Sequence, residues 1–205
     1  TWAEPQSLID HLVGTANLAS RFAESFESPT WAYAAGIAHD TGKSPEAWQR
    51  YLENKSGYNE EAHLETKLGT MDHSTPSAKL TEEVLGKGIG RILSYCIAGH
   101  HAGLPDWIES KSALSFRLQN TKTTGIPAEY REILATYRPS TPPWKFAPKG
   151  LDMSLWIRMI FSCLVDADFL DTEAYMESSK AELRGEYLPI ADLLTRFNIY
   201  MTEKT

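Results

Sequence analysis

An apolar stretch that ends in two adjacent polar side chains limits what this chain can fold into. In the segment "AAGIAHDTGK", residues 34–43, small and apolar residues lead directly into His39 and Asp40. Burying either side chain without a partner would be unfavourable by several kcal/mol. A fold that buries the apolar stretch must therefore bring partners to His39 and Asp40 from elsewhere in the chain.

Apolar residues recur at three- and four-residue spacing in most of the chain, which is typical of helices that bury one face. In residues 7–26 the apolar face includes His11. Further helices are predicted at residues 31–39, from 45 onward, from 74 or 75 onward, and at 89–100, 128–137, 151–170, 172–184 and 190–200. No segment shows convincing strand alternation, so the predicted fold class is all-α.

Glycine, proline and polar residues predict where these helices begin and end. Gly42 is expected to end the helix that carries His39. Ser74 or Thr75 is expected to cap the helix that contains Pro76 in its first turn. Residues 53–70 and most of 106–150 are expected to be loop or irregular structure, and 139–148 is a proline-rich connector.

Length and composition bound the class of protein. A chain of 205 residues can bury a core without a disulfide or a structural metal, so any metal is expected to be catalytic. The net charge of −7 argues against a protein that binds mainly nucleic-acid phosphates. Cys96 and Cys163 lie in apolar stretches and are predicted to be core residues. With no signal peptide or membrane-spanning run, a cytoplasmic protein without membrane contact is expected.

The histidines form a pattern together with Asp40. Taken one at a time, each has an ordinary explanation, such as a hydrogen-bonded core histidine or a charge at a helix end. Only His63 lies in a polar segment with no such context. Together they are ligands that borderline divalent metals prefer, and no cysteine pair suggests a structural zinc site. The candidate ligands are His11, His39, Asp40, His73, His100 and His101.

A further acidic ligand is expected from the segment "FSCLVDADFLDTE", where Asp166 and Asp168 are the candidates. At 100° per residue, Asp168 shares a helix face with Ile160 and Leu164, whereas Asp166 points away. The helix geometry favours Asp168, although a break in the helix would exchange the two.

Five blocks occur in order: "HLVGTANLASRFA", "AHDTGK", "DHSTPSA", "AGHHAGLPDW" and "SCLVDADFLDTE". The set resembles the HD superfamily of metal-dependent phosphohydrolases and, more narrowly, the HD nuclease domain of the type I CRISPR-associated helicase-nuclease. This resemblance implies an HD-domain helical bundle with a metal site between helices. It implies that residues 1–185 form the nuclease domain and that 186–205 form a C-terminal helix or the start of a linker to a helicase.

The resemblance also implies roles for the candidate residues. One ion would be held by His11, His39 and Asp168, and the other by His73, His100 and His101, with Asp40 bridging both. Lys43 would neutralise a phosphate oxygen, or would only complement a helix C-terminus. The expected metals are two divalent transition-metal ions (iron, manganese, nickel or cobalt), with magnesium and zinc as alternatives. The "DADF" run departs from the single Ala-Asp of many relatives. Candidates for orienting the histidines are Asp72, Asp106, Thr15 and Thr172.

The function implied is cleavage of single-stranded DNA, as an endo- or exonuclease, in CRISPR interference. Its implied partners are a helicase, fused or separate, and an RNA-guided surveillance complex. The sequence has no P-loop motif, so a domain that acts without ATP is expected. As an isolated domain it is expected to be a monomer. One alternative is a hydrolase of nucleotides or cyclic nucleotides. Another is a metal-stabilised docking module without turnover.

Overall fold

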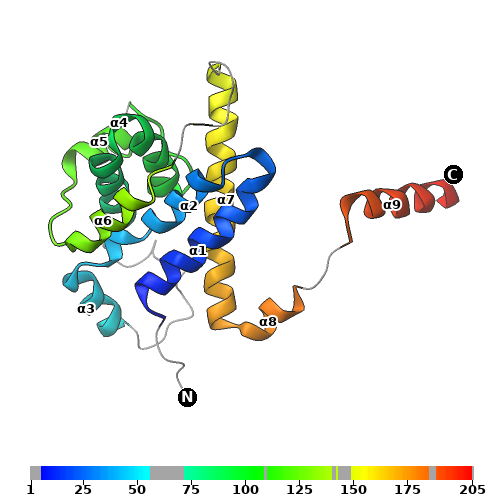
Figure 1. The fold of residues 1–205 in the computed structure, drawn as a ribbon, viewed down its shortest axis with the longest axis horizontal. Helices are drawn as coiled ribbons and strands as arrows, with labels where there is room; N and C mark the ends of the chain where they lie inside the picture. Colours follow the sequence, from blue (N-terminus) through cyan, green and yellow to red (C-terminus); the bar gives the residue numbers. More distant parts are fainter. Residues whose placement is uncertain are drawn as a thin grey trace. The chain divides into compact units, whose positions relative to one another are not determined.

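A computed structural model describes residues 6–55, 72–108, 110–139, 142, 149–184 and 188–204 (Figure 1). These residues contain helices and no strand, which confirms the all-α prediction. The α-helices are α1 (Leu8–Phe22), α2 (Pro29–Ala38), α3 (Glu46–Lys55), α4 (Ser74–Gly99), α5 (Leu114–Asn120), α6 (Ala128–Thr136), α7 (Gly150–Met176), α8 (Ser178–Leu183) and α9 (Ile190–Lys204). Short 3₁₀ turns, η1 (Ala23–Phe26) and η2 (Thr41–Lys43), follow α1 and α2.

The chain divides into two compact units, residues 1–171 and residues 172–205. The first unit contains α1 to α6 and most of α7, and it holds the hydrophobic core. The second contains the end of α7, together with α8 and α9, and none of its described residues is buried. The candidate ligands all belong to the first unit.

Helices α1 and α2 pack at very short range because small residues meet where they cross. A Cβ atom added at Gly36 would lie 2.4 Å from the Cα atom of Ala16, so only glycine fits there. Helix α1 begins after Ser7, whose Oγ accepts a hydrogen bond from the backbone N–H of Asp10 at 3.1 Å. This close pair carries His11 near the start of α1 and His39 at the end of α2.

Helix α7 lies against the same core. Trp156 donates its indole N–H to Ser28 Oγ at 2.7 Å, which ties α7 to the start of α2.

Cys96 and Cys163 are buried free cysteines, as predicted. Large fully buried side chains of α1, α2, α4 and α7 include Leu12, Trp31, Ile37, Leu80, Leu93, Ile97, Ile160 and Leu164, and α5 and α6 add Leu114 and Leu134. Among the described helices, none has the length and apolar composition needed to cross a bilayer.

The predictions for two helix ends were wrong. Helix α2 ends at Ala38, and Gly42 lies in η2 without a left-handed backbone. Glycine is needed at position 42 for another reason: an added Cβ would come within 2.1 Å of the carbonyl oxygen of His73. Neither Ser74 nor Thr75 caps α4, because His73 takes the N-cap position and Asp72 Oδ1 accepts the Thr75 N–H at 3.0 Å.

Two further helix predictions need correction, and one loop prediction lies partly outside the described residues. Helix α5 lies within a segment expected to be irregular. The break expected near residue 171 is absent: α7 continues to Met176, since no glycine or proline interrupts residues 151–176, and the short α8 forms the rest of the helix predicted at 172–184. The predicted loop at 53–70 overlaps the end of α3, and residues 56–71 are outside the described part of the chain.

Candidate metal centre

The candidate ligands come from four helices and meet at one place in the first unit. His11 lies on α1, His39 and Asp40 follow α2, and Asp168 lies on α7. The other three flank α4, with His73 before it and His100 and His101 after it. The structure places their ligand atoms in two groups, each within 4.8 Å: His11, His39 and Asp168 form the first group, and Asp40, His73, His100 and His101 form the second group.

In the first group, the imidazole nitrogens face each other and one carboxylate. His11 Nε2 lies 3.2 Å from Asp168 Oδ1 and 3.2 Å from His39 Nε2. His39 Nε2 lies 3.5 Å from the same carboxylate oxygen. Three potential donor atoms therefore converge on a single small volume.

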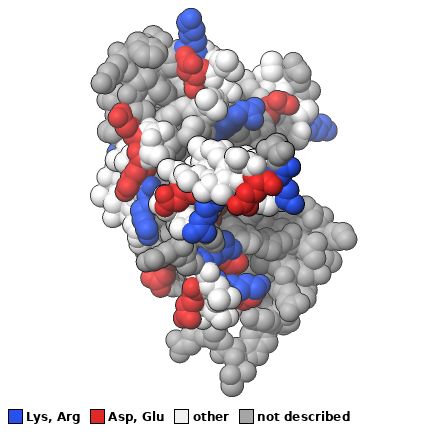
Figure 2. Space-filling model, turned by 90° about the vertical axis from the view of Figure 1, so that its right-hand side faces the viewer, with Lys and Arg blue, Asp and Glu red and all other residues white. Residues whose placement is uncertain are grey.

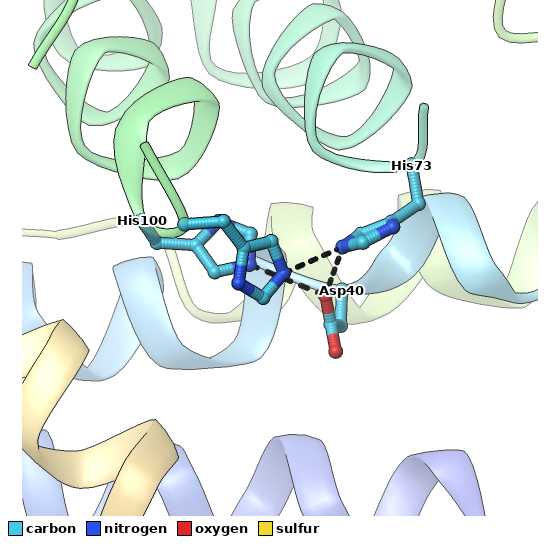
Figure 3. A group of neighbouring side chains, drawn as sticks. Asp40, His73 and His100 are labelled. Atoms are coloured by element: carbon cyan, nitrogen blue, oxygen red, sulfur yellow. Dashed lines mark hydrogen bonds and ion pairs between the residues drawn. The ribbon is translucent and has the colours of Figure 1, made fainter. Parts of the chain in front are cut away.

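The second group has the same character. Figure 3 shows His73 and His100, from the two ends of α4, pointing at Asp40. Asp40 Oδ1 lies 3.2 Å from His73 Nε2 and 3.5 Å from His100 Nε2. His101 Nε2 completes the group at 3.0 Å from His73 Nε2.

Asp40 lies between the two groups and turns one oxygen toward each. While Oδ1 faces the second group, Oδ2 lies 3.5 Å from His39 Nε2 and 3.7 Å from His11 Nε2. Lys43 Nζ also lies 2.8 Å from Oδ2. A single carboxylate is thus placed to serve as a ligand on both sides.

Burial makes this arrangement costly without a cation. His39 and Asp40 are 0% and 1% exposed. Asp40 Oδ1 and His100 Nε2 are buried, and neither has a hydrogen-bond partner among the described residues. Buried polar atoms without partners are rare and destabilising. Imidazole and carboxylate are ligands of divalent transition metals, so the residues present fit such ions.

The other ring nitrogen of three histidines is held by an acceptor. His39 Nδ1 donates to the Gly36 carbonyl at 2.7 Å, and His100 Nδ1 donates to the Ile97 carbonyl at 2.6 Å. A carbonyl can only accept, so Nδ1 carries the hydrogen and the Nε2 lone pair is left for a metal. This is the usual orientation of metal-binding histidines.

For His11 the acceptor is Asp171, whose Oδ2 lies 2.8 Å from Nδ1. Sequence reasoning missed this residue, although its position three residues after Asp168 places it on the same helix face. Gly14 makes the contact feasible, because an added Cβ would lie 1.9 Å from Asp171 Oδ1. Of the residues expected in such roles, Asp72 instead accepts hydrogen bonds at the start of α4, and Thr15 Oγ1 has no described partner.

The charges of the groups shift their pKa values strongly. Burial alone would raise the pKa of Asp40, but the ammonium of Lys43 and the neighbouring His39 side chain hold it well below its usual range. The pKa of Asp168 is likewise lowered, against the effect of burial, by His39 and His11. For His11, burial favours the neutral ring, yet hydrogen bonds to Asp168 and Asp171 raise its pKa to about 9.

A family model for the HD domain matches residues 8–124, more than half of the chain. The match contains all five histidines of the two groups, together with Asp40. The chain belongs to the HD domain family. No curated protein matches it. HD domains are metal-dependent hydrolases, and the two groups are where this HD domain can bind its metal. Asp168 lies beyond the matched residues and reaches the centre through the packing of α7.

Asp168 and Asp166 offer a matched pair of variants in this HD domain. Asp166 is exposed, whereas Asp168 lies in the first group. Asp168→Ala is expected to weaken metal binding by about 100-fold, because it removes a charged ligand. Asp166→Ala should bind as the wild type does in isothermal titration calorimetry. Equal loss in both variants would show that the choice between them is wrong.

The pH dependence of stability should reveal His11 in the metal-free protein. Its pKa is about 9 when folded and near 6.5 when unfolded. The stabilisation is therefore complete below pH 6.5 and is lost as the pH rises through 9. Melting temperatures in EDTA should fall over this window, and less so for His11→Gln. Metal affinity should rise over the same window, since the ion competes with this proton. Identical pH profiles for wild type and His11→Gln would contradict the assignment.

Proposed function

We propose that this HD domain is a nuclease that hydrolyses phosphodiester bonds of single-stranded DNA with two divalent cations, as part of CRISPR interference. The observation that carries the two-cation part is the position of Asp40, with one oxygen toward each group. Support for single-stranded DNA comes from the five ordered sequence blocks, which extend past the matched family region into α7.

In this proposal the protein binds each ion with neutral imidazoles and a carboxylate. The first group would hold one ion, the second group the other, and Asp40 would bridge them. Bound cations of this kind would activate water for attack on phosphorus and offset charge on the attacking and leaving oxygens. The suggested ions are manganese, iron, nickel or cobalt, with magnesium and zinc as alternatives.

Lys43 would contact the substrate rather than the ions. Its Nζ lies beside Asp40 Oδ2 and 5.6 Å from the centre of the Trp48 ring, so its cation is directed toward the centre. There it could neutralise a phosphate oxygen as negative charge develops. Lys43→Ala is expected to lower the turnover number by about 100-fold with unchanged metal content. Metal loss in elemental analysis of that variant would instead indicate a structural role.

The charge distribution on one face of the molecule gives little help in binding a strand. On the face shown in Figure 2, basic and acidic side chains of described residues are intermixed. We further propose that residues 1–185 act as the nuclease domain and that 186–205 lead toward a helicase, fused or separate. An RNA-guided surveillance complex in the cytoplasm would supply the strand to this monomeric domain.

The test compares substrates with one preparation of the protein. Single-stranded oligonucleotides, nucleoside monophosphates and cyclic nucleotides are incubated with manganese, nickel or cobalt, with EDTA as the control. Cleavage of oligonucleotides alone is the expected result. Hydrolysis of mononucleotides or cyclic nucleotides in preference to oligonucleotides would favour a nucleotide phosphohydrolase. Thermal stabilisation by metal without any hydrolysis would favour a docking module.

A further inference from the structure

Helix α4 consists of two helical halves that run back along each other. Gly86 separates them, with φ 79° and ψ 170°, a backbone conformation that glycine adopts readily. The halves pack at short range because a Cβ at Gly90 would lie 2.6 Å from the Thr81 carbonyl oxygen. Ser94 Oγ also donates a hydrogen bond to the Ala78 carbonyl at 2.7 Å. The two halves therefore form an antiparallel helical hairpin.

The register of this hairpin determines which residues meet at its open end. Thr81 lies near Gly90, and Ala78 lies beside Ser94. Continuing the same register places His73 opposite Gly99 and His100. Figure 3 shows the two helix ends side by side, with both side chains directed at Asp40. The geometry of the second group is thus the geometry of the open end of the hairpin.

One guanidinium joins the two halves at that end. Arg117, on α5, donates from Nε to Thr75 Oγ1 at 2.9 Å and from Nη2 to Ser74 Oγ at 3.2 Å, both on the first half. Its Nη1 donates to the Ala98 carbonyl on the second half at 3.1 Å. These contacts lie within two residues of His73 and of His100. A planar guanidinium holds such contacts at a fixed separation.

We propose that Arg117 is a positioning residue that sets the distance of His73 from His100 and His101, and so the affinity of the second group for its cation. The inference rests on the metal-binding part of the proposed function and not on the identity of the substrate. Arg117 touches no candidate ligand side chain. Its effect would pass through the backbone on which those ligands lie.

The experiment measures binding of Mn²⁺ by calorimetry, together with metal content after dialysis. Wild type is expected to bind two ions. Arg117→Ala should bind one ion as before and the other at least about 10-fold more weakly. Arg117→Lys should not restore the affinity, because an ammonium cannot span both halves as the guanidinium does.

The matched control is Arg131→Ala. Arg131 also contacts the first half of α4, because its Nη2 donates to Glu83 Oε2 at 3.0 Å, far along the helix from His73. The same Nη2 donates to Thr123 Oγ1, outside α4, at 2.8 Å. This variant should bind both ions as the wild type does. Two ions bound by Arg117→Ala with wild-type affinities would overturn the inference. A wild type that binds no pair of ions would overturn the two-cation proposal itself, and the inference with it.

A second measurement avoids metal altogether. In EDTA, histidine side-chain NMR signals report the contact between His73 Nε2 and His101 Nε2, which are 3.0 Å apart. Arg117→Ala should shift these signals and leave those of His11 unchanged. If Arg117→Ala does not fold, Thr75→Val is used instead. It removes Thr75 Oγ1, which accepts hydrogen bonds from both Nε and Nη2 of Arg117, at nearly constant side-chain volume. Thr75→Val should shift the same NMR signals and weaken binding of the same ion. Unchanged signals together with unchanged metal affinity would overturn the proposal.

Discussion

Replacing Asp40 by asparagine is expected to reduce hydrolysis to the level seen in EDTA and to leave no pair of tightly bound cations. The substitution keeps the shape of the side chain but removes its charge from a buried site. Both groups lose a ligand at once, because each Asp40 oxygen lies within 3.7 Å of imidazole nitrogens of a different group. No other candidate ligand contacts both groups in this way among the described residues.

Asp166→Asn is the matched control for that variant. It makes the same chemical change in an exposed aspartate, so activity and metal content should stay at wild-type values. Activity would be measured on a single-stranded oligonucleotide with manganese, and metal content by elemental analysis after dialysis. Full metal-dependent activity in Asp40→Asn would exclude the bridging role.

Gly36→Ala, which adds a single methyl group, is expected to cause a large loss of stability. The added Cβ would lie 2.4 Å from Ala16 Cα and 2.7 Å from its backbone nitrogen. Backbone atoms cannot rotate away, so α1 and α2 must separate, and about 3 kcal/mol of stability should be lost. For a chain of this length, the melting temperature should fall by roughly 10 °C. Metal affinity should fall as well, since these helices carry His11 and His39.

Gly88→Ala provides the comparison for Gly36→Ala. Gly88 also lies within a helix, but an added Cβ would have no atom within 4 Å. Alanine there should stabilise the protein by about 0.5–1 kcal/mol, because it restricts the unfolded chain. Both variants would be compared with wild type by urea unfolding in EDTA. A Gly36→Ala protein as stable as Gly88→Ala would contradict the close crossing of α1 and α2.

Local pattern was enough to predict most helices. Apolar spacing is a property of a few consecutive turns, so it predicted the helices around residues 8–22, 128–136 and 190–204. It failed at helix ends, where the outcome depends on tertiary contacts. Gly42 was interpreted as a helix terminator. A side chain is excluded at this position because it would clash with the His73 carbonyl, which belongs to another element. The seven-residue helix α5 was too short to show a period.

The chemical types of the ligands were visible in the sequence, since imidazole and carboxylate groups at apolar helix ends imply partners. Membership of the HD domain family follows from the same residues. His63, the remaining histidine, lies outside the described residues. Helix geometry also favoured Asp168 over Asp166, and α7 continues without a break through both.

What only the tertiary structure decided is how these side chains are placed relative to one another. The sequence determined an all-α chain with metal-binding residue types, because spacing and polarity act over neighbouring residues. The two oxygens of Asp40 facing different groups, the contact of Asp171 with His11, and the hairpin of α4 joined by Arg117 all depend on residues far apart in the chain. Their distances are set by how closely helices pack, and that depends on contacts that no local pattern records.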